Sequence, residues 1–139
     1  MKIFYEQSNS NRRRCRWNDG CIKGSENGHD VTLLEKNEKL GKKLFITGKG
    51  RCNVTNASDM ETIMSQIVTN PRFLYSAFSD CSNTDVMELI ENGGCPLKIE
   101  RGQRVFPQSD RAHDVADALV AALAERGVEV LYKTRAKSW

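Results

Sequence analysis

The stretch HDVTLLEKNEKLGKKLFITGKGRCNVTN, residues 29–56, decides the fold class of this chain. It opens with a short apolar run after an Asn-Gly turn, which predicts a β-strand over residues 30–35 that ends in Glu35. In dinucleotide-binding folds the carboxylate at this point accepts hydrogen bonds from an adenosine ribose. Because unrelated strands also end in Glu, the assignment depends on the residues that follow.

The second half of the stretch is rich in glycine and in basic and short polar side chains. Glycine allows the backbone to approach a ligand closely, Lys and Arg neutralise phosphate, and Thr and Asn add hydrogen-bonding groups. Such a loop could bind a pyrophosphate and the polar edge of a ring. The alternative is a basic, glycine-rich surface loop, which has the same composition. The residues concerned are Gly41, Lys42, Lys43, Thr47, Gly48, Gly50, Arg51, Asn53, Thr55 and Asn56.

Length and composition are those of one small globular domain. The chain has 139 residues, of which 39% are hydrophobic and 28% are charged. No apolar run reaches the roughly 18 residues of a membrane span, and the first residues lack an export signal, so we expect a cytoplasmic protein without a membrane partner. The five cysteines lack the paired spacing of a metal site, which indicates reduced thiols and no bound metal.

Residues 1–25 differ in character from the rest of the chain. They hold six basic and two acidic residues, whereas the remainder carries a net charge of −1. The run from Arg12 to Trp17, RRRCRW, is typical of a nucleic-acid-binding arm in which Trp17 could stack on a base. A solvated or disordered tail is the other interpretation, and it is the commoner one for a short basic run.

Short helices and strands are predicted after the glycine-rich loop. Ser58 and Glu61 match a capping box ahead of an apolar face that includes Val68. Asn70 and the following proline predict the start of a second helix, with Phe73 on its apolar face. The remaining predictions are a helix over 84–92, two strands within 95–107 joined at 101–103, a helix over 110–126 and a strand over 128–134. The last helix-to-strand step is typical of a parallel α/β sheet.

Four segments, taken in order, resemble the BaiN-like flavoproteins, a family of bacterial NAD(P)/FAD-dependent oxidoreductases. This family includes aminoacetone-oxidase-like enzymes and a bile-acid reductase. The resemblance covers residue 26 to about residue 137, and it is specific because TGKGRCNVTN is a rare decamer. The segments are TLLEKNEKLGKKLFITGKGRCNVTN, TNPRFLYSAF, GCPLKIERGQRVFPQSD and DVADALVAAL.

The resemblance implies an FAD-binding, Rossmann-like domain of the glutathione-reductase type, with FAD across the ends of a parallel sheet. Glu35 would hold the ribose, the lysines would lie near the diphosphate, and Gly48 to Asn53 would follow the flavin. The resemblance implies that this chain is a fragment of a longer parent enzyme. In that intact parent, NAD(P)H would reduce FAD, and the reduced FAD would then reduce a small organic acceptor or oxygen. The implied cofactor-binding residues are Glu35, Lys36, Lys42, Lys43, Thr47, Gly48, Gly50, Arg51, Cys52, Asn53 and Thr55. The resemblance identifies no catalytic residue; Arg101, Arg104 and Ser109 are candidates for loop contacts.

Residues 1–25 also depart from the family pattern. Gly20, Gly24 and Gly28 do not have the spacing of the expected G-x-G-x-x-G turn, and no apolar strand stands directly before them. Shifted by one base, the codons of this segment permit a buried strand, that glycine turn and an alanine-rich helix. Our hypothesis is therefore that residues 1–25 are an out-of-frame or disordered segment that replaces the first βα unit.

On this hypothesis residues 26–139 are a partial FAD/NAD(P)-binding α/β domain that lacks the first βα unit and the C-terminal part. The strand over 30–35 would then have no parallel neighbour on the side of the first strand. Without the glycine turn the chain should bind FAD poorly and be inactive. The alternative is a small basic protein that binds nucleic acid through Arg12 to Trp17; no oligomeric state follows from the sequence.

Overall fold

The computed structural model describes residues 2–6, 21–22 and 24–135. These residues divide into two compact units. Unit 1 lies within Met1–Lys43 and Leu119–Trp139, and unit 2 is Leu44–Ala118. Among the described residues, no helix is both long enough and apolar enough to cross a bilayer.

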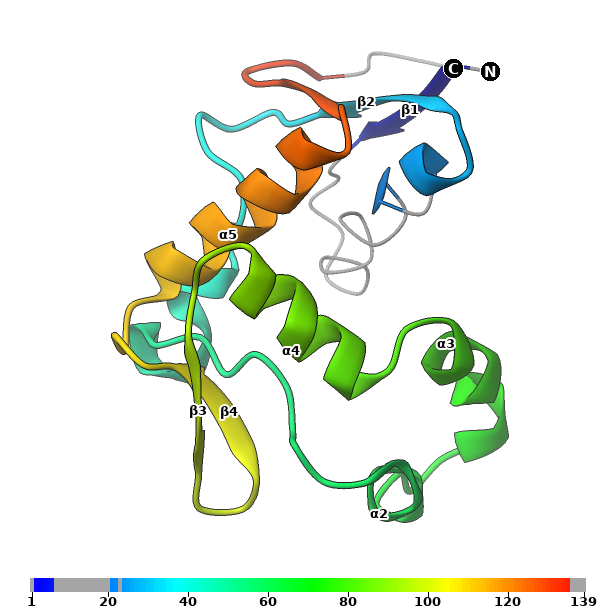
Figure 1. The fold of residues 1–139 in the computed structure, drawn as a ribbon, viewed down its shortest axis with the longest axis vertical. Coiled ribbons are helices and arrows are strands. Elements are labelled where there is room, and N and C mark those ends of the chain that lie inside the picture. The colour runs from blue at the N-terminus through cyan, green and yellow to red at the C-terminus, as the bar shows by residue number, and fades with distance from the viewer. Residues whose placement is uncertain (1, 7–20, 23, 136–139) are drawn as a thin grey trace. The chain divides into compact units, whose positions relative to one another are not determined.

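Unit 1 contains a parallel three-stranded sheet in the order β1-β2-β5, of which β1 and β2 are labelled in Figure 1. Val31 and Leu33 in the middle strand are 4% and 1% exposed, and Thr32 between them is 2% exposed. A strand buried on both faces is typical of a parallel sheet. The Thr32 hydroxyl donates a hydrogen bond to Glu129 at 3.2 Å in the neighbouring strand. The strands are β1 (Lys2–Glu6), β2 (Asp30–Leu34) and β5 (Glu129–Leu131).

The expectation that this middle strand has no parallel neighbour on its first-strand side is wrong. β1 pairs with β2 in parallel register, from Lys2 opposite Asp30 to Glu6 opposite Leu34. The sequence KIFYE is short and is followed by a polar segment instead of a glycine turn, so no local pattern marked it as a strand. Residues 7–20, which include the basic run, lie outside the described residues, and the out-of-frame hypothesis stays a prediction.

The end of helix α5 (Ala112–Glu125) is tied to the segment that precedes β2, and both belong to unit 1. The Ser25 hydroxyl donates to the carbonyl oxygen of Arg126. The Arg126 guanidinium lies 3.4 Å from a carboxylate oxygen of Glu26. Gly127, two residues after the helix, has a φ of 67°, a conformation that glycine adopts without steric cost. These contacts fix the start of β2 and the approach to β5.

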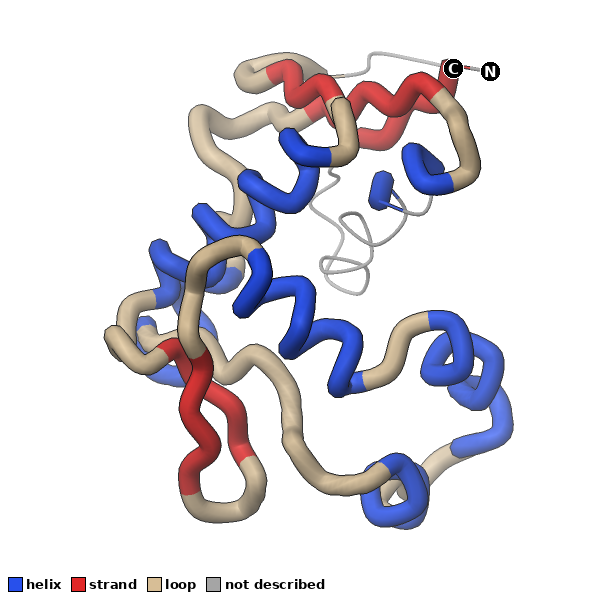
Figure 2. Tube along the Cα trace, viewed as in Figure 1, coloured by secondary structure: helices blue, strands red, loops and turns tan. Residues whose placement is uncertain are grey.

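Unit 2 is built around an antiparallel hairpin, as the sequence predicts. The loop after η1, drawn as a long tan segment before α2 in Figure 2, lies beside this hairpin, since Val54 donates to the carbonyl of Val105 at 2.9 Å. Val105, Phe106 and Ile90 are each at most 2% exposed and form the core of the unit. The elements are η1 (Leu44–Gly50), α2 (Met60–Ser65), η2 (Pro71–Leu74), α3 (Tyr75–Asp80), α4 (Asn83–Asn92), β3 (Leu97–Glu100) and β4 (Arg104–Pro107).

One predicted helix cap and parts of two apolar faces are wrong. Asp59, and not Ser58, caps α2, because its side chain accepts a backbone N–H of the first turn. The predicted start at Asn70 is confirmed, since Asn70 is the N-cap residue of η2 and a proline follows it, although its side chain makes no capping hydrogen bond. Val68 is 98% exposed because α2 has already ended, and Phe73 is 75% exposed in a 3₁₀ turn, whose three-residue period breaks the α-helical spacing.

Candidate functional site

Glu35 lies directly after β2, at the carboxyl end of the middle strand of the sheet. Its backbone is fixed on both sides, since its N–H donates to Leu131 at 2.9 Å and its carbonyl accepts from Thr134 at 3.0 Å. The side chain is 1% exposed. Its Oε1 accepts two hydrogen bonds of 2.6 Å from Asn37, one from the backbone N–H and one from the side-chain amide.

The second carboxylate oxygen of Glu35 is the unusual feature of unit 1. Oε2 is buried and has no hydrogen-bond partner among the residues that the structure describes. Burying a carboxylate oxygen without a donor is costly, so such atoms in native proteins call for an explanation such as a missing ligand. A pair of hydroxyl donors from a ribose would satisfy it, and this carboxylate therefore fits the adenosine half of a dinucleotide.

The predicted basic residues of unit 1 follow this carboxylate in sequence. Lys36 is half-buried, whereas Lys42 and Lys43 are exposed. Exposed ammonium groups can neutralise phosphate without a desolvation cost. Their assignment to a diphosphate stays a prediction.

The other predicted cofactor residues lie in unit 2, in a tightly turned loop. Gly48, Lys49 and Gly50 have φ values of 55°, 57° and 87°, and Cys52 has a φ of 61°. Lys49 and Cys52 are side-chain-bearing residues in the left-handed region, a conformation that persists only where the surroundings enforce it. A Cβ on Gly48 would lie 2.8 Å from the backbone nitrogen of Asn53, so only glycine fits there.

Hydrogen bonds within the loop use several of the predicted polar groups. The Thr47 hydroxyl donates to the carbonyl of Leu44 at 2.9 Å, and the Cys52 N–H donates to Thr47 at 3.2 Å. With its side-chain amide oriented to match its neighbours, Asn53 donates to the carbonyls of Thr55 and Val105 at 3.1 and 3.2 Å. Thr47 and Asn53 therefore maintain the loop conformation, whatever else they contact.

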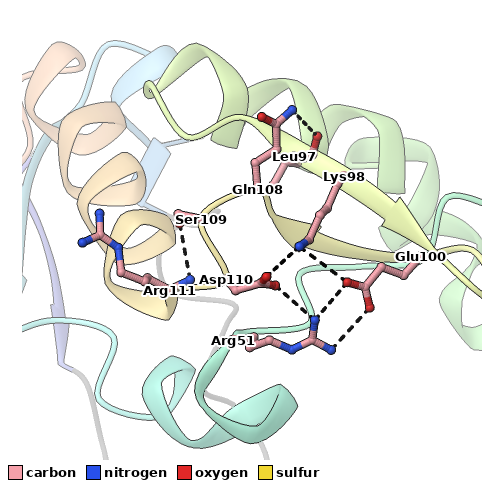
Figure 3. A network of polar contacts seen from close by, with 8 residues as sticks. All are labelled: Arg51, Leu97, Lys98, Glu100, Gln108, Ser109, Asp110 and Arg111. Atoms are coloured by element: carbon pink, nitrogen blue, oxygen red, sulfur yellow. Dashed lines mark hydrogen bonds and ion pairs between the residues drawn. The ribbon is translucent and has the colours of Figure 1, made fainter.

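Arg51 belongs to a four-charge cluster formed with Lys98, Glu100 and Asp110 (Figure 3). Its guanidinium donates to both oxygens of Glu100, at 2.9 and 3.3 Å, and to Asp110 at 3.1 Å. Lys98 lies 2.7 Å from Asp110 and 3.6 Å from Glu100. The guanidinium also lies over the ring of Phe106, 4.1 Å from its centroid. Two cations and two anions thus balance one another within unit 2.

The pKa values in this cluster shift as its geometry requires. The hydrogen bond from Arg51 lowers the pKa of Glu100, and the hydrogen bond from Lys98, followed by that from Arg51, lowers the pKa of Asp110. Hydrogen bonds to Glu100 and Asp110 raise the pKa of Arg51. Arg51, Glu100 and Asp110 are therefore charged at neutral pH.

Sequence reasoning missed the partners of Arg51 and also missed Asn83. Asn83 is 8% exposed, and its side-chain amide donates to the carbonyls of Asn56 and Ser58 at 2.8 and 2.9 Å. These partners are 25 or more residues away in the chain, so no local spacing announces them.

The three weak candidates for loop contacts lie at the hairpin and the turn after it. The Nε of Arg104 donates to the carbonyl of Arg101 at 3.0 Å in the hairpin turn. The Ser109 hydroxyl accepts the backbone N–H of Arg111 at 3.3 Å. These contacts are local, and a role toward substrate stays a prediction for all three.

Thiol and metal chemistry have little support in the described part of the chain. Within this part, Cys21, Cys52, Cys81 and Cys95 are not joined to one another by disulfide bonds. Burial raises the pKa of Cys21 to about 11, and burial also raises the pKa of Cys95, so neither is a ready thiolate. Residues 2–6, 21–22 and 24–135 contain no group of three or more His, Cys, Asp or Glu side chains placed to hold a metal ion.

A parallel sheet with a buried carboxylate at the end of its middle strand defines a Rossmann-like nucleotide-binding domain. The chain belongs to the HI0933-like Rossmann domain family, whose model matches residues 20–139. The predicted α/β, Rossmann-like fold class and the resemblance to the BaiN-like flavoproteins are thereby confirmed. The family is of the FAD-dependent, oxidoreductase-like kind.

Curated relatives carry enzyme names. The chain is 30% identical over 115 residues to a 3-dehydro-bile acid delta(4,6)-reductase of Clostridium scindens, a match that covers 82% of this chain and 27% of the reductase. It is 25% identical to a ribosomal RNA dihydrouridine synthase of Haemophilus influenzae, a match that covers 77% of this chain and 26% of the synthase. It is 31% identical to the ribosomal RNA dihydrouridine synthase of Escherichia coli, and that match covers 67% of this chain and 22% of the synthase. The chain spans about a quarter of the length of these relatives.

A solved structure shows the same fold. The crystal structure of THI4 from Thermovibrio ammonificans matches with a TM-score of 0.52 at 10% identity, over 94% of this chain and 37% of that one. At this identity the similarity concerns the fold alone.

Proposed function

We propose that this chain forms part of the FAD-binding domain of an oxidoreductase that, in its intact form, uses NAD(P)H to reduce FAD. When bound, FAD supplies the hydride-accepting chemistry. The role of this chain's residues is to hold the adenosine half of the cofactor and to shape the loop that follows. No residue described here is assigned to proton transfer.

The observation that carries the proposal is the unpartnered Oε2 of Glu35. The carboxylate is buried at the carboxyl end of a parallel strand, and Asn37 holds its other oxygen in place. Ligands bind at that end of the strands in open parallel α/β sheets. A ribose that donates to Oε2 would replace an unsatisfied buried atom with a charge-assisted hydrogen bond.

The test is a titration of the isotope-labelled 139-residue chain with FAD, and separately with ADP, followed by backbone amide NMR signals. NMR signals detect weak binding. We expect weak binding because residues 1–25 do not contain the G-x-G-x-x-G sequence that forms the pyrophosphate-binding turn. The amides of residues 33–37 should shift with both ligands, since ADP contains the adenosine ribose. Glu35→Gln should weaken binding by roughly 10- to 100-fold, because the hydrogen bonds to a charged acceptor are lost.

The matched control is Glu38→Gln. Glu38 is an exposed carboxylate three residues further on, paired with Lys133 at 3.0 Å, and its loss changes the net charge equally. We expect no change in either affinity for this variant. Equal affinity of wild type and Glu35→Gln, or no shift at residues 33–37 with millimolar FAD, would contradict the proposal.

The electron acceptor is the open part of this proposal. We retain the sequence-based expectation of a cytoplasmic enzyme with a small-molecule acceptor and no nucleic-acid partner. The relatives' names mention a bile acid in one case and ribosomal RNA in two. An acceptor assay on the intact parent should therefore include a bile acid and an RNA; reduction of the RNA alone would overturn the small-molecule expectation.

A further inference from the structure

The four-charge cluster connects the glycine-rich loop of unit 2 to two segments that come much later in the sequence. Arg51 comes from the glycine-rich loop, Lys98 and Glu100 from β3, and Asp110 from the turn before α5. The pairs that Arg51 makes span 49 and 59 residues. The cluster is thus a long-range attachment of the loop to the hairpin and to the turn.

The loop and the turn that meet in this cluster both contain strained backbone. Lys49 and Cys52 on either side of Arg51, and Asp110 itself, have φ values between 56° and 61°. Such residues hold their conformation only when other contacts fix them. The bidentate Arg51–Glu100 contact and the second contact to Asp110 are charged contacts placed between these segments.

The charge of Arg51 is already matched by its two carboxylate neighbours. Its guanidinium is also placed over Phe106, which is 2% exposed. Three of the five N–H groups of Arg51 are donated to these carboxylates, so a phosphate would have to compete with two anions for the same guanidinium. The arrangement therefore opposes the use of this arginine as a phosphate ligand.

We propose that Arg51 is a positioning residue that holds the Gly48–Asn53 loop in its left-handed conformation through the four-charge cluster, instead of contacting the cofactor's diphosphate. This inference rests on the proposed function in one respect, namely that the ligand near the loop is FAD. The attachment itself is a property of unit 2.

The test uses Cys52, which is 1% exposed and adjacent to Arg51, as a reporter of loop opening. The full chain is treated with iodoacetamide under native conditions, and the alkylation rate of each cysteine is measured by peptide mass spectrometry. Arg51→Met should raise the rate at Cys52 by about fivefold or more, because the loop opens more often when its attachment is lost. The rate at Cys21, which is fully buried in unit 1, should not change.

Three further variants separate positioning from other effects. Glu100→Gln removes the main partner with little change of shape and should raise the Cys52 rate in the same direction. Arg51→Lys keeps a charge but cannot make the bidentate contact, so its rate should be intermediate. The control is Arg104→Met, because Arg104 also lies near the Phe106 ring, at 5.7 Å, yet is outside the four-charge cluster; its Cys52 rate should stay at the wild-type value.

The outcomes distinguish this inference from the proposed function. If Arg51→Met leaves the Cys52 rate unchanged while FAD binding weakens, Arg51 is a phosphate ligand and the positioning role is wrong. If the Cys52 rate rises as expected and no variant binds FAD, the positioning role stands and the proposed function fails. If Arg51→Met raises the Cys21 rate as well, the variant unfolds, and the Glu100→Gln result decides, with an unchanged Cys52 rate overturning the inference.

Discussion

Replacing Gly48 by alanine should destabilise the chain more than any replacement that changes only backbone freedom. The φ of 55° places alanine in the left-handed region, at a cost of roughly 1–2 kcal/mol. The new Cβ would also lie 2.8 Å from the backbone nitrogen of Asn53 and 3.1 Å from Phe106. A backbone atom cannot rotate away, so overpacking adds about 1–3 kcal/mol. The free energy of unfolding should fall by roughly 2–5 kcal/mol in total.

The comparison variant is Gly102→Ala in the hairpin turn. Gly102 has a φ of 76°, and a Cβ there would meet no heavy atom within 4 Å, so only the left-handed cost of about 1–2 kcal/mol applies. Urea unfolding followed by near-UV circular dichroism measures both free energies, provided that the slopes agree. Equal losses for Gly48→Ala and Gly102→Ala would refute the close approach at Gly48.

Three further predictions concern packing, a buried amide and acid stability. Gly93→Ala places a Cβ 2.6 Å from the Ala118 carbonyl oxygen and should lower the urea-derived free energy of unfolding by about 1–3 kcal/mol; a loss near zero argues against this packing. Asn83→Ala leaves two backbone carbonyls without their donor and should cost about 1–3 kcal/mol, read as a lower melting temperature; an unchanged melting temperature contradicts the contact. Arg51 lowers the pKa of Glu100, and Lys98 lowers the pKa of Asp110, through hydrogen bonds. The stability that these two carboxylates contribute is therefore complete above their ordinary pKa of about 4. It is lost as the pH falls through the lowered pKa values. The free energy of unfolding, measured as a function of pH below about 5, should fall less steeply for Arg51→Met than for the wild type. Identical curves for the two proteins would contradict the lowered pKa values.

Local signals in the sequence are sufficient for the parts of the fold that local physics determines. The strand that leads to Glu35 follows from an apolar run after a turn, and the β3–β4 hairpin follows from two short strands around Gly102. The position of Glu35 at the end of this strand could be anticipated because a motif places an acidic residue at that point. Its unpartnered oxygen could not, since only the folded environment shows which atoms lack a donor.

Features that depend on distant residues could not be predicted. The pairing of β1 with β2 depends on register between segments separated by a stretch with no recognisable pattern. Arginine in a glycine-rich loop is typical of a phosphate ligand. Only the fold shows that Glu100 and Asp110 neutralise the charge of Arg51. The spacing of Phe73 predicts an apolar position only in an α-helix, whereas the segment forms a 3₁₀ turn.

The position of β2 between β1 and β5 affects how the chain folds during its synthesis. Thr32 and its partner Glu129 are 97 residues apart, so the strand at the centre of the sheet is made long before its second neighbour. At about 5–20 residues per second, β2 would leave the ribosome with one open edge for roughly 5–20 seconds. All of unit 2 is synthesised in that interval, and an unpaired strand edge promotes aggregation. A nascent chain of this protein should therefore depend on chaperones until β5 has emerged.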